Sequence, residues 1–359
     1  MESITLKQFT VLLNRDAYEK ALPIFGAFEL TPLCNLDCKM CYVHLQNPTV
    51  RNRMLRGNQW LSVMQEAIDC GLFSALLTGG EAMTHPDFWN IYMFLIDHGV
   101  SVRVKTNGIL LNGQNIERFK TYPPHLIDIS LYGCDSDSYL AVTGVDAYQR
   151  VVDNIRMAID AGLCIRIMIT PSGYMSPWTE RVMELAKSFG VKVIVNSVLI
   201  EPDENTGRRK QDFDLTESEN ARIREKRDEL FPLKFMSPEE ENEIYGSIEK
   251  RADIQEKGLY CNGGRTSFAI NWDGTMGPCL SFPRDIVCAH PLTDGFETAW
   301  HQVNECVRNY TVPDKCRSCR LNTKCHYCPT QHGKMAARHK CDPQVCSYWA
   351  NVYKKEDII

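Results

Sequence analysis

The sequence predicts an α/β protein, with parallel βαβ units over residues 24–200 and a small cysteine-rich α+β domain at 261–359. Two observations carry this prediction. In the first part, short apolar runs alternate with longer helical patterns, which is typical of parallel strands joined by right-handed crossovers. In the second part, ten of the 16 cysteines fall among glycines and turn residues.

Six strands are expected in the first domain, at residues 25–30, 74–78, 100–106, 126–131, 164–170 and 191–200. Helices are expected between them at residues 59–70, 88–98, 147–161 and 180–189. Six such units can curl into a partial barrel or lie as an open sheet, and the periodicity alone does not decide between the two. In either arrangement, ligands bind at the edge where the carboxyl ends of the strands meet.

Two further segments complete the expected organisation. Residues 1–23 form an N-terminal segment, and residues 201–260 form a charged region that bridges the two domains. In this bridge, Thr216 and Glu219 make a capping-box pattern that predicts a charged helix to about Leu230. In the cysteine-rich domain, the stretch AINWDGTMGPC predicts a short strand and an Asp-Gly hairpin turn.

Composition excludes several classes of protein. The net charge of −5 argues against a general nucleic-acid binder. No run of 18 apolar residues suggests a membrane span, and the N-terminus lacks the pattern of a signal peptide. We therefore expect a cytoplasmic protein, in which clustered cysteines bind metal more often than they form disulfides. The isolated Cys70, Cys134 and Cys164 are expected to be small buried hydrophobic residues.

The stretch C-N-L-D-C-K-M-C follows the first expected strand and places Cys34, Cys38 and Cys41 in one short loop. Three thiolates are one too few for a structural zinc site, which is usually four-coordinate. A 4Fe–4S cluster takes one thiolate per iron, so three thiolates leave one iron open to a ligand from outside the protein. The spacing therefore indicates a reactive cluster.

Polar or glycine-rich residues follow the other expected strands. They are Thr78-Gly79-Gly80-Glu81, Lys105-Thr106-Asn107-Gly108, Ser130-Leu131-Tyr132-Gly133 and Thr170. Each alone is consistent with ordinary turn chemistry. Because all of them end strands at the same edge as the cysteine loop, they favour a binding site there.

A second group of cysteines lies near the C-terminus, and it includes two C-x-x-C pairs that a zinc ribbon would also carry. Only five residues separate these pairs, which is short for a ribbon loop, and four further cysteines would remain without a role. The members of this group are Cys261, Cys279, Cys316, Cys319, Cys325, Cys328, Cys341 and Cys346.

The C-x-x-x-C-x-x-C loop after the first strand resembles the signature of radical S-adenosylmethionine (SAM) enzymes. That resemblance implies a partial (β/α)6 barrel, a 4Fe–4S cluster whose open iron binds SAM, and a 5′-deoxyadenosyl radical that abstracts a hydrogen from the substrate. It also implies SAM contacts along the strand ends, with Gly79, Gly80 and Glu81 at the amino group and Ser130 at the ribose. The other implied contacts are Met40, Tyr42, Thr106, Asn107, Arg150, Val198 and Leu199.

The C-terminal cysteines resemble the SPASM extension of radical SAM enzymes, which carries two auxiliary 4Fe–4S clusters. This implies Cys261, Cys279 and Cys328 as ligands of the first auxiliary cluster. The second would be held by Cys316, Cys319, Cys325 and Cys346, with Cys341 as an alternative to Cys346. The fourth ligand of the first cluster is open: either Cys341, Cys288 or Cys306 supplies it, or the site is left free for a substrate thiolate.

The resemblance implies an oxidoreductase that modifies a ribosomally made peptide, by a thioether or carbon–carbon crosslink or by epimerisation. Leu280 stands where sulfatase maturases carry a catalytic Asp, which disfavours formylglycine formation. Expected partners are the peptide, a separate leader-recognition protein and a flavodoxin- or ferredoxin-like electron donor, with no nucleic acid and no membrane. Three alternatives remain: a radical SAM enzyme for a small molecule such as a sugar alcohol, a maturase of a protein side chain, and a non-catalytic iron–sulfur electron carrier.

Overall fold

The structure is a computed structural model of the chain. It describes residues 6–43, 45, 48–196, 199, 202, 207, 209, 212–232, 256–319, 328 and 330. The bridging region is described only in part. Within these residues, no helix is long and apolar enough to cross a membrane.

One eight-stranded sheet organises the molecule, in the order β6-β5-β4-β3-β2-β1-β7-β8. All neighbours pair in parallel except β7 and β8, which pair antiparallel. The six strands expected from the sequence are present. The strands are β1 (Phe25–Glu29), β2 (Ser74–Thr78), β3 (Ser101–Thr106), β4 (Leu126–Ser130), β5 (Ile165–Ile169), β6 (Lys192–Val195), β7 (Ser267–Ile270) and β8 (Met276–Gly277).

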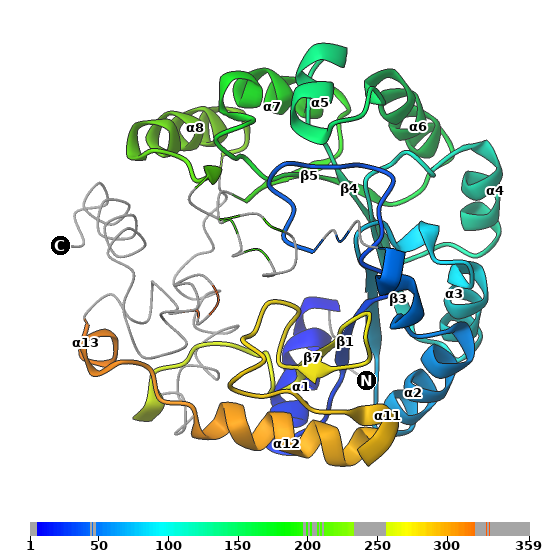
Figure 1. Cartoon of the computed structure of the whole chain (residues 1–359), viewed down its shortest axis with the longest axis vertical. Helices are drawn as coiled ribbons and strands as arrows, with labels where there is room; N and C mark the ends of the chain where they lie inside the picture. The colour runs from blue at the N-terminus through cyan, green and yellow to red at the C-terminus, as the bar shows by residue number, and fades with distance from the viewer. Residues whose placement is uncertain are drawn as a thin grey trace.

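Helices cover the outer face of the curved sheet (Figure 1). The four expected crossover helices and the charged helix are present, and α4 and α5 are two that the periodicity did not predict. The helices of this layer are α2 (Gly57–Asp69), α3 (Phe88–Asp97), α4 (Gly113–Thr121), α5 (Ser136–Thr143), α6 (Tyr148–Asp160), α7 (Thr179–Ser188) and α8 (Glu217–Leu230). Three short 3-10 turns lie at Pro48–Asn52, Ala82–Thr84 and Ser176–Trp178.

The two faces of the sheet differ in chemistry because side chains alternate along each strand. Val104, Ile129 and Ile167 are fully buried in the core between the sheet and its helices. Their neighbours in sequence, such as Lys105, Asp128 and Arg166, face the opposite, concave side. The barrel therefore has an apolar outer layer and a polar, charged lining.

The strand β7 extends the barrel sheet, and this was not expected from the sequence. The sequence predicted a separate C-terminal domain, whereas β7 pairs in parallel with β1 along Phe25–Phe28. The Phe28 and Phe268 rings meet edge to face with centroids 5.7 Å apart. The hydrogen-bonded sheet thus continues across the expected domain boundary, and the boundaries themselves stay a prediction.

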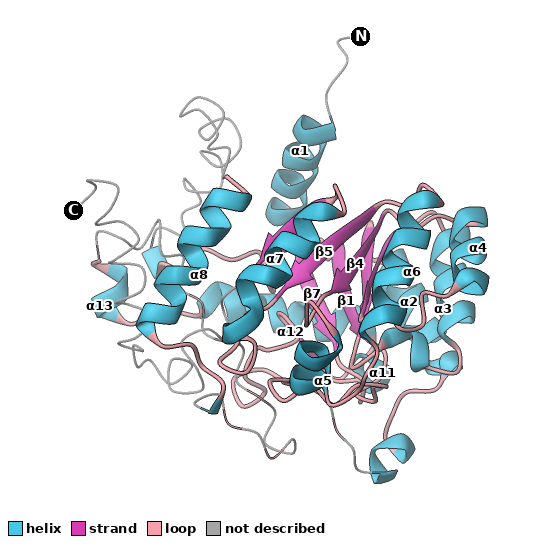
Figure 2. Ribbon diagram, turned by 90° about the horizontal axis from the view of Figure 1, so that it is seen from above, coloured by secondary structure: helices cyan, strands magenta, loops and turns pink. Residues whose placement is uncertain are grey.

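The N-terminal helix α1 (Leu6–Glu19) is held by the C-terminal part of the chain through α12 (Phe296–Asn309). The Trp300 indole N–H donates to the Ala21 carbonyl. The Arg308 guanidinium donates to the Tyr18 carbonyl at 2.6 Å and lies over the Tyr18 ring. Figure 2 shows α1 projecting beyond the end of the sheet. Two short helices, α11 (Pro291–Asp294) and α13 (Asp314–Arg317), flank α12 in sequence.

The expectation that the isolated cysteines are buried is wrong. Cys164 is exposed, and Cys70 and Cys134 are half-buried. Cys164 immediately precedes β5, at the edge of the sheet opposite the cysteine loop, and its carbonyl accepts a hydrogen bond from Ile127. It is exposed because it precedes the part of the sheet that the helices cover.

Candidate active site

The glycine loop after β2 packs directly on the chain that leads into the cysteine loop. The Gly80 N–H donates to the Thr31 carbonyl at 2.7 Å, and the Glu81 N–H donates to the Leu33 carbonyl at 3.0 Å. A Cβ atom at Gly80 would lie 2.4 Å from the Leu33 carbonyl oxygen, and one at Gly79 the same distance from the Thr31 oxygen. Glycine at these positions therefore allows two backbones to meet at the strand edge.

Glu81 is buried and links the loops that follow β2 and β3. Its Oε2 accepts hydrogen bonds from the Asn107 N–H at 2.7 Å and from the Thr106 hydroxyl at 2.9 Å, while Oε1 accepts from the Met83 N–H. Burial raises the pKa of this carboxyl, and the three hydrogen bonds oppose the rise. A carboxylate has about four acceptor sites, so Glu81 keeps capacity for a further donor such as an ammonium group.

Asn107 connects the β3 loop to the first cysteine. Its side-chain amide donates to the Asn35 side chain at 2.7 Å and to the Cys34 sulfur at 3.6 Å. From behind, the buried Asn154 on α6 donates to the carbonyls of Gly108 and Ile109. The loop that ends β3 is therefore fixed on both sides, and it positions a donor at a cysteine sulfur.

The helix α5 supports the cysteine loop with its C-terminal end. The Asp37 N–H donates to the Thr143 carbonyl at 2.8 Å, and the Lys39 N–H donates to the Val142 carbonyl at 3.1 Å. The last carbonyls of a helix have no partner within the helix, so they are free to accept from another segment. This helix, which the sequence did not predict, holds two backbone positions between the three cysteines.

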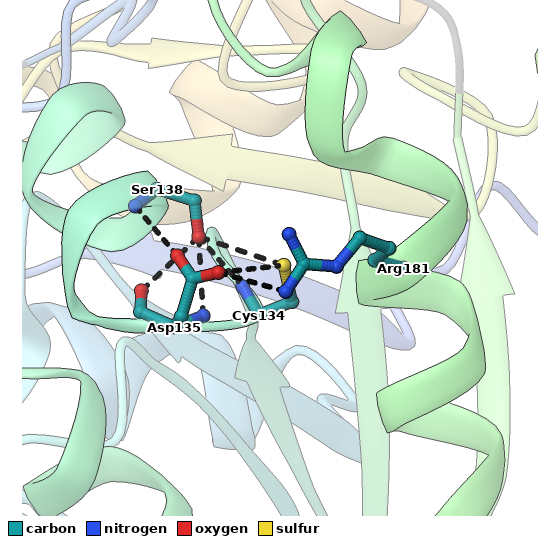
Figure 3. A network of polar contacts seen from close by, with 4 residues as sticks. All are labelled: Cys134, Asp135, Ser138 and Arg181. Atoms are coloured by element: carbon teal, nitrogen blue, oxygen red, sulfur yellow. Dashed lines mark hydrogen bonds and ion pairs between the residues drawn. The ribbon is translucent and has the colours of Figure 1, made fainter.

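The N-terminus of α5 is fixed by a capping box (Figure 3). The Asp135 carboxylate accepts from the Ser138 N–H at 2.8 Å and pairs with Arg181 on α7 at 2.9 Å. The Ser138 hydroxyl accepts from the N–H groups of Cys134 and Asp135. Hydrogen bonds from Ser138 lower the pKa of Asp135, with Arg181 adding to the effect.

Replacing Asp135 by Ala is expected to destabilise the protein by about 0.5–1 kcal/mol, because the helix loses its cap. Urea denaturation checks this, with Asp137→Ala as the matched control, since Asp137 lies in the same helical turn but does not cap. The folded-state pKa of Asp135 is lowered, so its contribution is present above the unfolded pKa of about 4 and is lost as pH falls through the folded pKa. A difference between Asp135→Ala and wild type that persists undiminished at pH 2 would contradict this assignment.

Two hydrogen-bond donors face the Cys34 sulfur, although its burial disfavours the free thiolate. Burial raises the pKa of this thiol to about 12, with repulsion from Glu81 and Cys41 contributing, while hydrogen bonds from the Leu36 N–H and Asn107 oppose the rise. Both donors point at the sulfur, at 3.4 and 3.6 Å. A thiolate bound to iron would retain these donors, since a ligating thiol gives up its proton.

Tyr139 on α5 provides an independent test of whether a further group fits here. Its ring is fully buried, and its hydroxyl has no hydrogen-bond partner among the residues that the structure describes. Burial raises the pKa of Tyr139, and repulsion from Cys38, Cys34 and Glu81 adds to the rise. Buried hydroxyls almost always have a partner, so this donor beside two of the three cysteines fits an acceptor that is bound between them.

The described residues include no set of three Cys, His, Asp or Glu side chains that would hold a single metal ion. A 4Fe–4S cube spreads its ligands over separate irons, each with its own thiolate. The cysteine loop therefore fits a cluster better than it fits a single ion.

The other residues predicted to contact SAM differ from one another in how far they are buried. Met40, Leu199 and Ser130 are buried, and the Ser130 side chain forms a hydrogen bond with the Tyr132 side chain. Arg150 is exposed near the start of α6, and Val198 lies outside the described residues. These positions stay predicted contacts.

Tyr42 lies between the two groups of cysteines. It is half-buried by area, yet the surrounding protein raises the pKa of its hydroxyl, with repulsion from Glu29, Cys41 and Cys279 adding to the effect. Its hydroxyl is thus within electrostatic reach of one cysteine from each group. The hairpin β7–β8 brings about this proximity, because Cys279 follows β8.

Three C-terminal cysteines, Cys261, Cys279 and Cys328, lie within electrostatic reach of one another. Burial raises the pKa of Cys279 to about 12, and repulsion from Cys261 and Cys328 adds to the rise. Burial also raises the pKa of Cys261, while a hydrogen bond from the Gly263 N–H and the charge of Arg265 oppose the rise. Cys261 and Cys279 both keep accessible area.

Cys288 and Cys306 lie in other surroundings. Arg284, Asp273 and Thr275 surround the Cys288 thiol, while Cys306 is on α12 with its sulfur 4.0 Å from the Ile286 carbonyl. Cys316 and Cys319 form one turn, in which the Cys319 N–H donates to the Cys316 carbonyl. The candidates Cys325, Cys341 and Cys346 lie outside the described residues.

Residues 28–174 match the family model described as "Radical SAM superfamily". This range contains the cysteine loop, the glycine loop and the Thr-Asn-Gly turn whose contacts are described above. This part of the chain therefore matches the radical SAM family, and that match implies a 4Fe–4S cluster and SAM.

Over nearly its full length, the chain resembles SPASM-containing peptide maturases. It is 22% identical over 361 residues to the antilisterial bacteriocin subtilosin biosynthesis protein AlbA of Bacillus subtilis, which covers 95% of this chain and 74% of AlbA. It shares its fold with Streptococcus suis SuiB bound to S-adenosylmethionine, at a TM-score of 0.68 and 16% identity over 96% of this chain and 84% of SuiB. The anSMEcpe protein with bound AdoMet has a TM-score of 0.63 at 15% identity over 92% of this chain and 100% of that chain.

A shorter match links the barrel to a probable GTP 3′,8-cyclase of Saccharolobus solfataricus, at 32% identity over 167 residues. It covers 46% of this chain and 53% of that protein. The similarity is confined to about half of each chain, in contrast with the match to AlbA.

Sequence reasoning missed Asn154 and Tyr139. Both act from helices behind the strand-end loops, and no local spacing identifies such residues. The polar strand end predicted from the sequence includes Lys105, which lies on the charged, concave face of the sheet.

Proposed function

We propose that this enzyme cleaves SAM reductively at the cluster of Cys34, Cys38 and Cys41 and uses the resulting radical to modify a ribosomally made peptide. The single observation that carries the proposal is the joining of three strand-end loops at one cysteine sulfur and one buried carboxylate. Glu81 bridges the β2 and β3 loops at 2.7 and 2.9 Å, and Asn107 of the β3 loop reaches Cys34.

In this proposal each protein group has a defined task. The Glu81 carboxylate accepts from the SAM amino group with its remaining acceptor capacity. Asn107 and the Leu36 N–H donate to the Cys34 sulfur, and Tyr139 donates to an acceptor between the cysteines. The bound cluster and SAM supply the radical chemistry, and the protein supplies positioning and the exclusion of water and oxygen. Gly79, Gly80, Ser130, Met40, Tyr42, Thr106, Arg150, Val198 and Leu199 complete the proposed SAM site.

Two auxiliary clusters belong to the proposal. The first is supported by the mutual electrostatic effects of Cys261, Cys279 and Cys328, because three thiols within reach of one another can serve as ligands of one cluster. The second would use Cys316, Cys319 and Cys325 with Cys346 or Cys341. Residues 261–359 would form this SPASM domain beside a barrel at 24–200.

A peptide substrate is supported by the relatives. SuiB has a structure bound to the precursor peptide SuiA, and anSMEcpe has one with a Kp18Cys peptide. Leu280, after Cys279, still disfavours formylglycine formation. A leader-recognition protein, a flavodoxin- or ferredoxin-like donor and a cytoplasmic location are further parts of the proposal.

The test uses anaerobically reconstituted enzyme with dithionite and SAM. We expect 5′-deoxyadenosine, and co-expression with a short peptide encoded beside the gene is expected to change that peptide's mass by loss of two hydrogens for a crosslink. Epimerisation would leave the mass unchanged but incorporate one deuterium from D₂O. Failure to form 5′-deoxyadenosine in enzyme with a full iron content would overturn the proposal.

A further inference from the structure

A row of charged side chains crosses the concave face of the barrel. Lys105 on β3 pairs in register with Asp128 on β4, Asp128 with Arg166 on β5, and Arg166 with Lys192 on β6. Registered neighbours in a parallel sheet lie about 4.8 Å apart and point to the same face. With Arg103, two residues before Lys105 on the same face, four cations lie in this part of the sheet with Asp128, and the buried carboxylate of Glu29 lies two strands away from Lys105, on β1.

The carboxylate of this row is held by two arginines. Asp128 is buried and accepts from the Arg166 Nε at 2.6 Å with one oxygen and from an Arg103 Nη at 2.8 Å with the other. Two guanidinium groups thus fix its position. Asp128 acts on Lys105 through its charge alone, without a hydrogen bond to the ammonium group.

Lys105 makes no hydrogen bond or ion pair with any residue that the structure describes, although it stands in the middle of a sheet. It keeps substantial accessible area, so the concave face is open to solvent there. Burial by the surrounding walls lowers its pKa, Arg103 and Arg166 add to this, and Asp128 opposes it. Lys105 thus has Asp128 within electrostatic reach but no direct ion-pair partner among the described residues, and a bound anion would supply one.

The position of Lys105 separates it from the proposed SAM contacts. Those groups begin at Thr106 and continue into the strand-end loops, whereas Lys105, Asp128 and Arg166 lie one row deeper in the barrel. Lys105 is nevertheless within electrostatic reach of Cys41. A group bound here would therefore lie next to the cluster loop without taking the place of SAM.

We propose that Lys105, with the Arg103–Asp128–Arg166 triad, binds a carboxylate of the substrate, so that the peptide carries an Asp or Glu beside the residue that is modified. This rests on the proposed function and names its substrate chemistry. The negative charge of an acidic side chain would balance the positive charge of Lys105 and the excess positive charge of the two guanidinium groups. A neutral amide carries no charge that could balance either.

The first test labels lysines of the reconstituted holoenzyme with trace acetic anhydride and measures each site by mass spectrometry. Three samples contain SAM alone, SAM with Ac-Ala-Ala-Glu-Ala-Ala-NH₂, or SAM with the Gln peptide of the same length. Only the Glu peptide is expected to protect Lys105, by about fivefold or more, while Lys120 on the outer surface is labelled equally in all three samples. Protection by SAM alone would assign the site to the SAM carboxylate and overturn the proposal.

The second test measures peptide binding by calorimetry. The Glu peptide is expected to bind the wild type at least about tenfold more tightly than the Gln peptide, as a charged hydrogen bond would give. Lys105→Met should abolish that preference, while Lys120→Met, which removes the same charge, should keep it. Equal affinity of the two peptides for wild type would overturn the proposal.

The two proposals fail in distinguishable ways. Formation of 5′-deoxyadenosine is measured in the same preparations. Holoenzyme that forms it but shows no Glu preference keeps the radical SAM function and loses the acidic subsite. Holoenzyme that shows Glu-selective protection but forms no 5′-deoxyadenosine keeps the subsite and loses the proposed reaction.

Discussion

Replacement of Cys34, Cys38 and Cys41 together by Ala is expected to abolish 5′-deoxyadenosine formation and to lower the iron content from about twelve to about eight per chain. All activity is lost because the cluster that delivers the electron loses every protein ligand. The two auxiliary clusters should remain, since their proposed ligands lie elsewhere in the chain. Anaerobic iron and sulfide analysis checks this result, together with chromatography of the nucleoside product.

The chain offers a matched control for this variant. Cys70, Cys134 and Cys164 are three cysteines outside both groups, and their triple replacement by Ala removes the same number of thiols. That variant should keep its iron and its SAM cleavage. A loss of about four irons in the control, or an unchanged iron content in the first variant, would refute the assignment of the cluster.

Gly80→Ala is expected to lower SAM affinity by at least about a hundredfold and to destabilise the protein by about 1–3 kcal/mol, the usual range for overpacking. The added Cβ would lie 2.4 Å from the Leu33 oxygen and 2.7 Å from the Pro32 oxygen. Both oxygen atoms belong to the backbone, so the steric clash can be relieved only if the two loops move apart. Separation breaks the hydrogen bonds that position Glu81, and SAM binding and thermal unfolding measure the result.

Gly113→Ala is the control for this substitution. Gly113 begins α4, and nothing lies within 4 Å of the position of its added Cβ. The change should leave SAM affinity unchanged and stabilise the helix by about 0.4–1 kcal/mol. If Gly80→Ala binds SAM as well as Gly113→Ala does, the close approach of the two loops has no role in the site.

The strands of the barrel could be predicted because each is a short apolar run that ends at a turn residue. The residues at their ends, from Cys34 to Ser130, could be predicted because parallel strands bring their carboxyl ends to one edge. These signals are local. The apolar run predicts the strand, and the turn residue predicts its carboxyl end. Together they place the cysteine loop beside Glu81 and Asn107.

The remaining features depend on contacts between distant segments. The pairing of β7 with β1 joins residues about 240 positions apart, and four residues of ordinary strand sequence cannot reveal a partner. The helix α5 was missed because its eight residues have almost no separation of polar and apolar faces. Tyr139 and Asn154 lie on helices, and only the packing of those helices brings them to the loops.

The pairing of β7 with β1 has a consequence for the order of folding during synthesis. The strand β1 leaves the ribosome early, but its second neighbour follows more than 200 residues later. Until then, β1 presents an open edge and the Phe28 ring, which are features that promote aggregation. Such long-range parallel pairing is slow to form. This edge of β1 would thus be covered only when the segment that also carries Cys261 and Cys279 arrives, so pairing of the β1 edge and arrival of these two proposed cluster ligands become a single event.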